Sequence, residues 1–377
     1  MKNPTIILRM TNACNLNCTY CYDKKNRMNI NEENEFIDKN LDKLVTYIHK
    51  IQSNPNEKSN IIFHGGEPLL IKVDIYEKLI KNLRRNNPNV KFSVQTNATL
   101  LNEEFINLFK KYKVNIGISL DGYNEEQNKC RIYKDGKNSF DIVMKKITLL
   151  KDMKAKFGII MTLSKGVLGH EKELYDFIAE NEIGCNMRPA FLSDSTDNEY
   201  VMSNSEFMKF FINIFEIWYA DDKRVKLTQI REIYEEFAKA LNPKYVVRSC
   251  VASDNCFENF VSLDINGELY SCNRLYNNKD LYYGNINDMT VEELNRKMKE
   301  LTKKRKENIE NSKCKKCSIY KYCYGGCPAS AFAKNNDIFS ADDYYCEAKV
   351  GIYKYLKARL EQTGAINEYE TRKNIKV

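Results

Sequence analysis

The sequence has little histidine and no long apolar run. Only three of its 377 residues are histidines, His49, His64 and His170, and no two of them are close in the chain. So few histidines therefore disfavour mixed cysteine and histidine zinc sites and a Ser-His-Asp triad. No run approaches the 18 apolar residues of a membrane span, and the first ten residues lack the apolar core and cleavage site of a signal peptide. We expect a cytoplasmic protein with no membrane partner.

Charge of either sign is also not concentrated anywhere. Lysine and arginine total 59 against 51 acidic residues, a net charge of +8, and the basic residues are mixed with acidic ones. Such mixing indicates solvated helix faces, so we expect no nucleic-acid partner. The 43% of hydrophobic residues are enough for a globular core and exclude wholesale disorder.

Cysteine is the residue type that stands out. There are 13, an odd number that is too sparse for a secreted disulfide scaffold. Because the chain shows no export signal, we expect reduced thiols that are available to metals. With so little histidine, any bound metal is expected to be held by sulfur.

Short β-branched runs alternate with amphipathic segments up to about residue 190. In the amphipathic segments the apolar residues recur every three or four positions, which is typical of helices. The alternation predicts a parallel sheet with right-handed crossovers, and about six units without a dinucleotide-binding glycine motif predict an α/β fold with a partial (β/α)6 TIM-like barrel. The expected strands are 5–9, 60–63, 90–95, 114–120, 156–163 and 184–189, and the expected helices are 34–51, 73–86, 103–112, 139–153 and 171–181.

Two further helices are expected after residue 200. Ser205 can cap the first, and the second covers about 226–241 and is ended by the Asn-Pro pair at 242–243. The apolar stripe of the first helix is most simply core packing. We therefore expect a barrel domain over 1–200 and a helical bridge over 201–249.

The region from Cys250 to Cys346 mostly lacks helical periodicity. It contains eight cysteines and a predicted hairpin over 260–270 with an Asn-Gly turn. Metal is expected to replace a hydrophobic core in this third domain. The remaining segment, 347–377, is expected to hold a helix over about 347–361 and a frayed tail.

Three cysteines follow the first expected strand directly. Cys14, Cys18 and Cys21 form CxxxCxxC on a loop that also carries Tyr20. Structural zinc needs four ligands, whereas three cysteines on a four-iron four-sulfur cluster leave one iron open to an outside ligand. An open iron indicates chemistry. The alternative is a structural zinc or cluster that a distant cysteine completes.

The motif CxxxCxYC resembles that of the radical S-adenosylmethionine (SAM) superfamily. The resemblance implies that SAM chelates the open iron through its methionyl amine and carboxylate. It continues at His64-Gly65-Gly66-Glu67-Pro68, which is similar to the GGEP motif of that family. There the glycines are expected to admit backbone carbonyls to a ligand ammonium, and Glu67 to supply compensating charge.

Segments after the third and fourth strands also resemble the family. They are QTN at 95–97 and SLDG at 119–122, and Arg131 matches an arginine that in relatives helps to bind the SAM carboxylate. For Ser119 and Arg131 the alternative is a loop hydrogen bond or a surface ion pair. The SAM-binding residues that the resemblance implies are Tyr20, Gly65, Gly66, Glu67, Pro68, Gln95, Asn97, Ser119 and Arg131.

The C-terminal cysteines are similar to those of a SPASM domain, which binds two auxiliary iron-sulfur clusters. Spacing alone does not assign them to clusters, and two zinc ribbons are the alternative. The resemblance implies three 4Fe-4S clusters and SAM as cofactors, with the auxiliary clusters relaying electrons because four thiolates leave no open iron. By analogy with anaerobic sulfatase-maturating enzymes, one auxiliary cluster is expected on Cys250, Cys256, Cys272 and Cys327, and the other on Cys314, Cys317, Cys323 and Cys346.

Three residues with reactive side chains are left over. We expect Cys130 and Cys185 to be buried as small apolar residues. His64, beside the expected SAM site, is open to either a structural or a functional role.

The resemblance covers residues 5–350 or so and implies a radical SAM enzyme. Reductive cleavage of SAM gives a 5'-deoxyadenosyl radical that takes a hydrogen atom from an unactivated carbon. We expect a flavodoxin or ferredoxin as electron donor and a peptide or protein as substrate. Auxiliary clusters suit an oxidative outcome, so the expected reaction is oxidation or cross-linking of a peptide side chain by a peptide (RiPP) maturase.

Two alternatives to that function stay open. The layout, with no leader-peptide-binding domain before Cys14, is most similar to the anaerobic sulfatase-maturating enzymes, which oxidise Cys or Ser to formylglycine. Their general base is an aspartate immediately after the third SPASM cysteine, where this chain has Asn273, an amide without useful basicity. We therefore prefer the peptide maturase and leave the catalytic base unassigned. The alternative of another class is a non-catalytic zinc or iron-sulfur binding module.

Overall fold

The computed structural model divides the chain into two compact units, each made of segments that are distant in sequence. The first consists of residues 3–160 and 255–304, and the second of residues 161–192, 198–254 and 305–365. These compact units do not follow the domain boundaries predicted from the sequence, and those boundaries stay a prediction. The residues that the structure describes are 3–24, 33–54, 56–190, 192, 198–221, 230–242, 244, 250–251 and 253–365.

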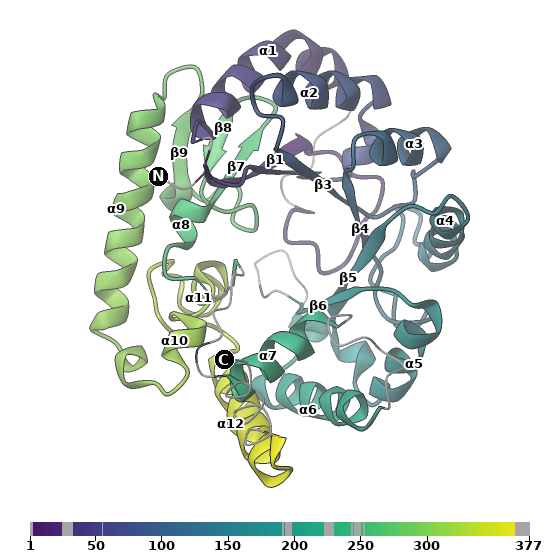
Figure 1. The fold of residues 1–377 in the computed structure, drawn as a ribbon, viewed down its shortest axis with the longest axis vertical. Coiled ribbons are helices and arrows are strands. Elements are labelled where there is room, and N and C mark those ends of the chain that lie inside the picture. Colours follow the sequence, from purple (N-terminus) through teal and green to yellow (C-terminus); the bar gives the residue numbers. More distant parts are fainter. Residues whose placement is uncertain are drawn as a thin grey trace, which may run out of the picture. The chain divides into compact units, whose positions relative to one another are not determined.

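The first unit is built on a sheet whose strands run in the order β5-β4-β3-β2-β1-β7-β8-β9 (Figure 1). From β1 to β5 each strand pairs in parallel with the next, as the alternation of strands and helices predicted. These strands are β1 (Thr5–Thr11), β2 (Asn60–Gly65), β3 (Lys91–Thr96), β4 (Asn115–Ser119) and β5 (Phe157–Leu163).

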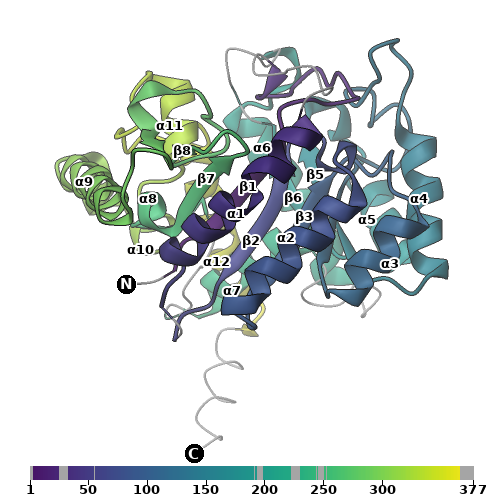
Figure 2. The same ribbon diagram turned by 90° about the horizontal axis from the view of Figure 1, so that it is seen from above.

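The helices between these strands lie within a residue or two of their predicted bounds. Figure 2 shows the first three side by side along the sheet. In α2 the residues Ile75, Leu79 and Leu83 are buried, so the apolar stripe read from the sequence packs in the core. The helices are α1 (Glu33–Ile51), α2 (Val73–Asn86), α3 (Glu103–Lys111) and α4 (Phe140–Asp152).

The predicted hairpin of the cysteine-rich region extends this same sheet. Its strands are β7 (Phe260–Asp264) and β8 (Glu268–Tyr270), and β7 pairs in parallel with β1. The turn falls at Gly267 as predicted, with a φ of +85° that favours glycine. A further strand, β9 (Tyr282–Asn285), pairs with β8, and α8 (Cys256–Asn259) precedes the hairpin.

A 20-residue helix, α9 (Val291–Glu310), corrects the expectation that helical periodicity mostly fails after Cys250. Its buried residues recur at helical spacing, but the series includes Thr302 and Arg305 beside Leu294, Met298 and Ile309. An apolar pattern therefore does not show in the sequence. A regular core helix is present in a region where metal was expected to replace a core.

The second unit is mostly helical. β6 (Cys185–Pro189) lies beside the end of β5, where the Ala190 N–H donates to the Leu163 carbonyl at 2.8 Å. In the part of the chain that the structure describes, no helix is both long and apolar enough to cross a bilayer. The helices are α5 (Glu171–Asn181), α6 (Asn204–Ala220), α7 (Arg231–Leu241), α10 (Tyr320–Cys323), α11 (Pro328–Asn335) and α12 (Cys346–Gln362).

The predicted cap of the first helix of the bridge is wrong. The cap of α6 is Ser203, not Ser205, because Ser203 and Glu206 form a capping box in which each side chain accepts from the other's backbone N–H. The next helix begins at Arg231, since Ile230 forms a β-bridge with Cys185. Residues 226–229 and the predicted tail after residue 365 lie outside the described residues.

Candidate functional site

The CxxxCxxC loop leaves the end of β1 and is held on one side by the segment that follows β4. The Asn17 N–H donates to the Ile132 carbonyl at 2.7 Å, and the Thr19 N–H donates to the Cys130 carbonyl at 3.0 Å. These bonds lie on either side of Cys18, which is buried. The loop is thus fixed by backbone pairing with a segment more than a hundred residues away.

The loop is held on its other side by the Gly65-Gly66-Glu67 segment at the end of β2. The Gly66 N–H donates to the Thr11 carbonyl and the Glu67 N–H to the Ala13 carbonyl, both at 2.8 Å. A Cβ atom on Gly65 would lie 2.2 Å from the Thr11 oxygen, and one on Gly66 would lie 1.9 Å from the Ala13 oxygen. Only glycine permits this approach, so the glycines position the residues just before Cys14.

Glu67 joins the loops that follow β2 and β3. Its carboxylate accepts from Leu69 N at 2.9 Å, from Thr96 Oγ1 at 2.6 Å and from Asn97 N at 2.8 Å. Pro68 begins the short 3₁₀ helix η3 (Pro68–Leu70) that Glu67 caps. Burial raises the pKa of Glu67 to about 7, although the three hydrogen bonds favour its charged form.

The QTN and SLDG segments contact each other and the cysteine loop. Asn97 Nδ2 donates to Asn15 Oδ1 at 2.9 Å and lies 4.0 Å from the sulfur of Cys14. Gln95 Nε2 donates to Ser119 Oγ at 2.9 Å, so Ser119 makes the loop hydrogen bond that was its alternative role. The ends of four successive strands therefore meet around the cysteine loop.

Tyr20, Asp121 and Arg131 form a buried cluster beside Cys18. The Tyr20 hydroxyl donates to Asp121 Oδ2, and Arg131 Nε lies 3.0 Å from that same oxygen. Burial opposes the charge of Arg131, but the Asp121 carboxylate outweighs it and raises the pKa of Arg131 further. Burial also raises the pKa of Tyr20, which stays a phenol. Arg131 is thus in a buried ion pair, not a surface one.

Arg9 is the centre of a second buried network in this unit. It is 0% exposed, and its guanidinium donates to Asn12 Oδ1 at 2.6 and 3.1 Å, to Asp23 Oδ2 at 2.7 Å and to Asn273 Oδ1 at 2.8 Å. The ring of Tyr276 lies 3.9 Å from the guanidinium carbon. A buried cation with a carboxylate and two amide acceptors is well compensated.

Asn273 uses both ends of its side-chain amide. While its oxygen accepts from Arg9, its Nδ2 donates to the Tyr22 hydroxyl at 3.0 Å. An ionised aspartate in this place could keep the contact with Arg9 but has no proton to donate to Tyr22. Asn273, the amide at the position where a general base was expected, is therefore an integral part of the Arg9 network.

His64 is hydrogen-bonded in place. Its Nδ1 accepts from the Gly65 N–H at 2.8 Å, and burial, with the nearby charge of Arg9, lowers the pKa of His64 to about 4. The imidazole is therefore neutral at pH 7.

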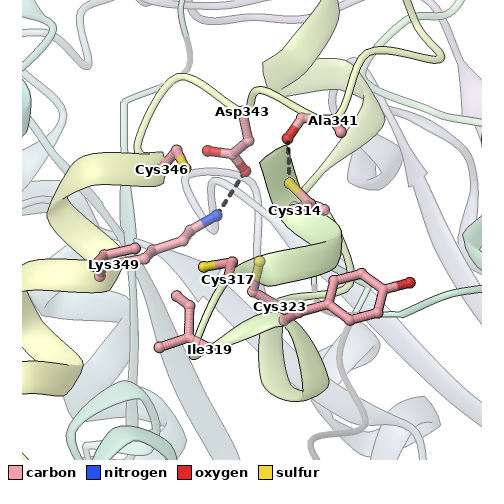
Figure 3. A pocket seen from close by; sticks show the side chains of 12 residues that line it. Cys314, Cys317, Ile319, Cys323, Ala341, Asp343, Cys346 and Lys349 are labelled. Carbon is pink, nitrogen blue, oxygen red and sulfur yellow. Dashed lines mark hydrogen bonds and ion pairs between the residues drawn. The ribbon is translucent and has the colours of Figure 1, made fainter. Parts of the chain in front are cut away.

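In the second unit, four cysteines line a single small cavity (Figure 3). They are the four that the resemblance places on one auxiliary cluster: Cys314, Cys317, Cys323 and Cys346. Burial raises the pKa of the Cys346 thiol to about 11 and also raises those of Cys314 and Cys323. Buried thiols of this kind become thiolates when a metal supplies positive charge, so the donor set fits a sulfur-ligated cluster.

The other predicted auxiliary ligands are divided between the two units. Cys256 and Cys272 belong to the first unit, while Cys250 and Cys327 belong to the second. Their pairing on one cluster stays a prediction. In the described part of the chain, no three Cys, His, Asp or Glu side chains are grouped for a single metal ion.

The two remaining cysteines are buried as predicted, Cys130 at 1% exposure and Cys185 at 3%. Cys130 also supplies the carbonyl that fixes Thr19.

Sequence reasoning missed the network partners Arg9, Asp23 and Asp121. Asp121 was within reach, since it is the acid of the SLDG segment. Arg9 lies within the mostly apolar strand β1, and its buried partners come from segments up to 264 residues away. No local pattern in the sequence brings those segments together.

The chain matches two family descriptions. Residues 8–178 match the Radical SAM superfamily, and residues 255–318 match the iron-sulfur cluster-binding domain known as SPASM. A cysteine-type anaerobic sulfatase-maturating enzyme of Clostridium perfringens is 28% identical over 372 residues, which cover 94% of this chain and 96% of that enzyme.

Solved structures show the same architecture. The structure described as native anSMEcpe with bound AdoMet and Kp18Cys peptide has a TM-score of 0.77 and 25% identity, and covers 97% of this chain and 100% of that chain. Streptococcus suis SuiB bound to the precursor peptide SuiA has a TM-score of 0.65 and 17% identity, with coverage of 92% of this chain and 76% of that one. At that identity the second likeness concerns the fold alone.

Proposed function

We propose that this chain, a radical SAM enzyme with a SPASM domain, oxidises or cross-links a side chain of a peptide substrate. The observation that carries the proposal is the CxxxCxxC loop, which GGEP, QTN and SLDG segments hold in place at the ends of successive strands. Reductive cleavage of SAM at a cluster held there supplies a primary carbon radical that takes a hydrogen atom from the substrate. The residues around the loop then have to bind SAM and exclude water.

The surrounding residues divide into those that hold the loop and those that are available to SAM. Gly65, Gly66 and Pro68 shape the turn against the loop, and Glu67 joins it to the QTN segment. Arg131 carries a charge suited to the SAM carboxylate, and Asp121 and Tyr20 orient it. Gln95, Asn97 and Ser119 complete the proposed SAM contacts through their polar side chains.

We further propose three 4Fe-4S clusters, with the two auxiliary ones as electron relays. An auxiliary cluster would accept the electron that a substrate radical releases when it also loses a proton and becomes an oxidised or cross-linked product. A flavodoxin or ferredoxin is the proposed donor of the electron that SAM cleavage needs. The cavity lined by four cysteines supports one of the auxiliary sites.

Sulfatase maturation is the second candidate, and it is favoured by the names of the relatives. Against it stands Asn273, whose amide binds Arg9 and Tyr22 and offers no basic group. We therefore infer a different peptide substrate.

The test is to reconstitute the protein anaerobically, to count iron and sulfide, and to assay 5'-deoxyadenosine after adding dithionite and SAM. The proposal expects about twelve irons and formation of 5'-deoxyadenosine. Zinc without SAM cleavage would instead support a non-catalytic binding module. Sulfatase-motif peptides are then compared with peptides from small reading frames beside the gene, and formylglycine at a rate typical of sulfatase maturation would refute the preference for another peptide.

A further inference from the structure

One cationic side chain reaches the cavity that the four cysteines line. Lys349 extends from α12 toward the sulfur atoms of Cys317, Cys323 and Cys346 (Figure 3). Its side chain is 29% exposed and lines the cavity. The SAM chemistry proposed above assigns this lysine no task.

Asp343 fixes the position of that ammonium. Its carboxylate lies 2.6 Å from Lys349 Nζ and also accepts from the backbone N–H groups of Cys327, at 2.9 Å, and Tyr345, at 2.7 Å. Its side chain is only 3% exposed. A Cβ atom on residue 326 would lie 2.4 Å from the Asp343 side chain, so Gly326 makes room for this arrangement.

The charge on Lys349 is secure. Burial opposes it, but the neighbouring Asp343 carboxylate outweighs burial and holds the pKa of Lys349 above its ordinary value.

We propose that Lys349, oriented by Asp343, sets the reduction potential of the cluster that Cys314, Cys317, Cys323 and Cys346 hold. The inference rests on the proposed auxiliary cluster. Reduction adds one negative charge to a cluster, and a fixed cation beside it stabilises the reduced form. Lys349 neither gives up a proton nor carries an electron. The electron comes from the substrate radical and leaves to an oxidised one-electron carrier such as a flavodoxin.

The alternative is that the Lys349 and Asp343 pair only maintains the local fold. The two roles separate by sign. If charge is what matters, removing the ammonium must make the cluster harder to reduce. Replacing the Asp343 carboxylate with a neutral amide, whose oxygen can still accept from Lys349 Nζ, must make the cluster easier to reduce. Structural damage alone does not predict shifts of the reduction potential with opposite signs in the two variants.

The experiment is an anaerobic redox titration of the reconstituted full chain, followed by electron paramagnetic resonance, after iron and sulfide have been counted. We expect Lys349→Met to make reduction of one auxiliary cluster at least tenfold less favourable, which is about 59 mV for a one-electron couple. Asp343→Asn should shift it in the opposite direction, and Lys349→Arg should stay within threefold of the wild type. The control is Lys321→Met, which removes an exposed lysine near Cys323 and should change the equilibrium less than twofold.

Wild-type protein without auxiliary clusters would refute the proposed function itself. With full clusters, an unchanged potential in Lys349→Met, or shifts of the same sign in Lys349→Met and Asp343→Asn, would overturn only this inference. If Lys349→Met loses iron, its reduction potential does not test the inference. The potential of Asp343→Asn, which retains the ammonium of Lys349, then tests it. Loss of iron in both variants would assign the pair a structural role and also overturn the inference.

Discussion

Glu67 gives a prediction whose size follows from its environment. Burial raises the pKa of this carboxyl from 4.5 to about 7, a difference of roughly 2.5 units. At about 1.36 kcal/mol per unit, ionising Glu67 in the folded chain costs about 3 kcal/mol of stability. The folded state binds the proton more tightly than the unfolded state, so stability is lost as the pH rises from 4.5 to 7.

Glu67→Gln removes this titration. Its lost hydrogen bonds add a penalty that does not depend on pH, and all other groups titrate alike in both proteins. Between pH 5.5 and 8 the free energy of unfolding of the variant should therefore rise by about 2 kcal/mol relative to the wild type. Urea unfolding followed by circular dichroism measures this difference at each pH. Glu104→Gln, an exposed acid on α3, is the matched control and should show no such trend.

Two results would refute this reasoning. The first is a difference between Glu67→Gln and wild type that is constant across the pH range, which would mean that burial does not penalise the charge. The second concerns the compensation of the SAM ammonium by Glu67, which the family resemblance implies. Saturating SAM should lower the pKa of Glu67 and shrink the trend, and an unchanged trend would contradict that role.

Three further predictions concern other parts of the chain. Arg131→Met leaves Asp121 buried without its cation, so we expect a loss of about 3–5 kcal/mol in unfolding free energy and at least tenfold weaker SAM binding by calorimetry. Binding that matches the wild type would remove Arg131 from the proposed site. Ser203→Ala should cost about 1 kcal/mol of stability because it loses the cap of α6, while Ser205→Ala should be close to neutral. A larger loss of thermal stability in Ser205→Ala than in Ser203→Ala would instead support Ser205 as the cap. Asn273→Leu should cost about 1–3 kcal/mol by breaking one buried and one partly buried hydrogen bond. Asn273→Asp should retain the fold and its iron, and efficient formylglycine formation by that variant would show a sulfatase-maturating site lacking only its base.

The regular part of the fold could be predicted because local patterns and tertiary packing agree there. The apolar stripe of α2 that the sequence shows is the stripe that is buried. In α9 the local pattern and the tertiary packing disagree, since the charged residue Arg305 occupies a core position. Its guanidinium donates to the carbonyls of Gly325, Gly326, Ile338 and Ser340, partners that exist only once the chain has folded. A local pattern cannot indicate such compensation.

The residues of the candidate site also divide into those that could be predicted from the sequence and those that could not. Contiguous motifs such as His64 to Pro68 could be located from the sequence, because their spacing is local. The reason why glycine is needed at position 66 is not local, since it lies in the closeness of the Ala13 carbonyl. The Arg9 network was not predictable either, because Asp23 and Asn273 reach the guanidinium from separate loops.

The most direct test of the central claim asks whether SAM binds an iron atom that the protein leaves open. SAM labelled with ¹⁵N at its amine is added to the reduced, reconstituted protein, and the coupling of that nitrogen to the cluster is measured by electron nuclear double resonance. Our account predicts a coupling of a directly bound nitrogen in the wild type and none in Cys14→Ala. A wild-type cluster that shows no coupling at saturating SAM would contradict it.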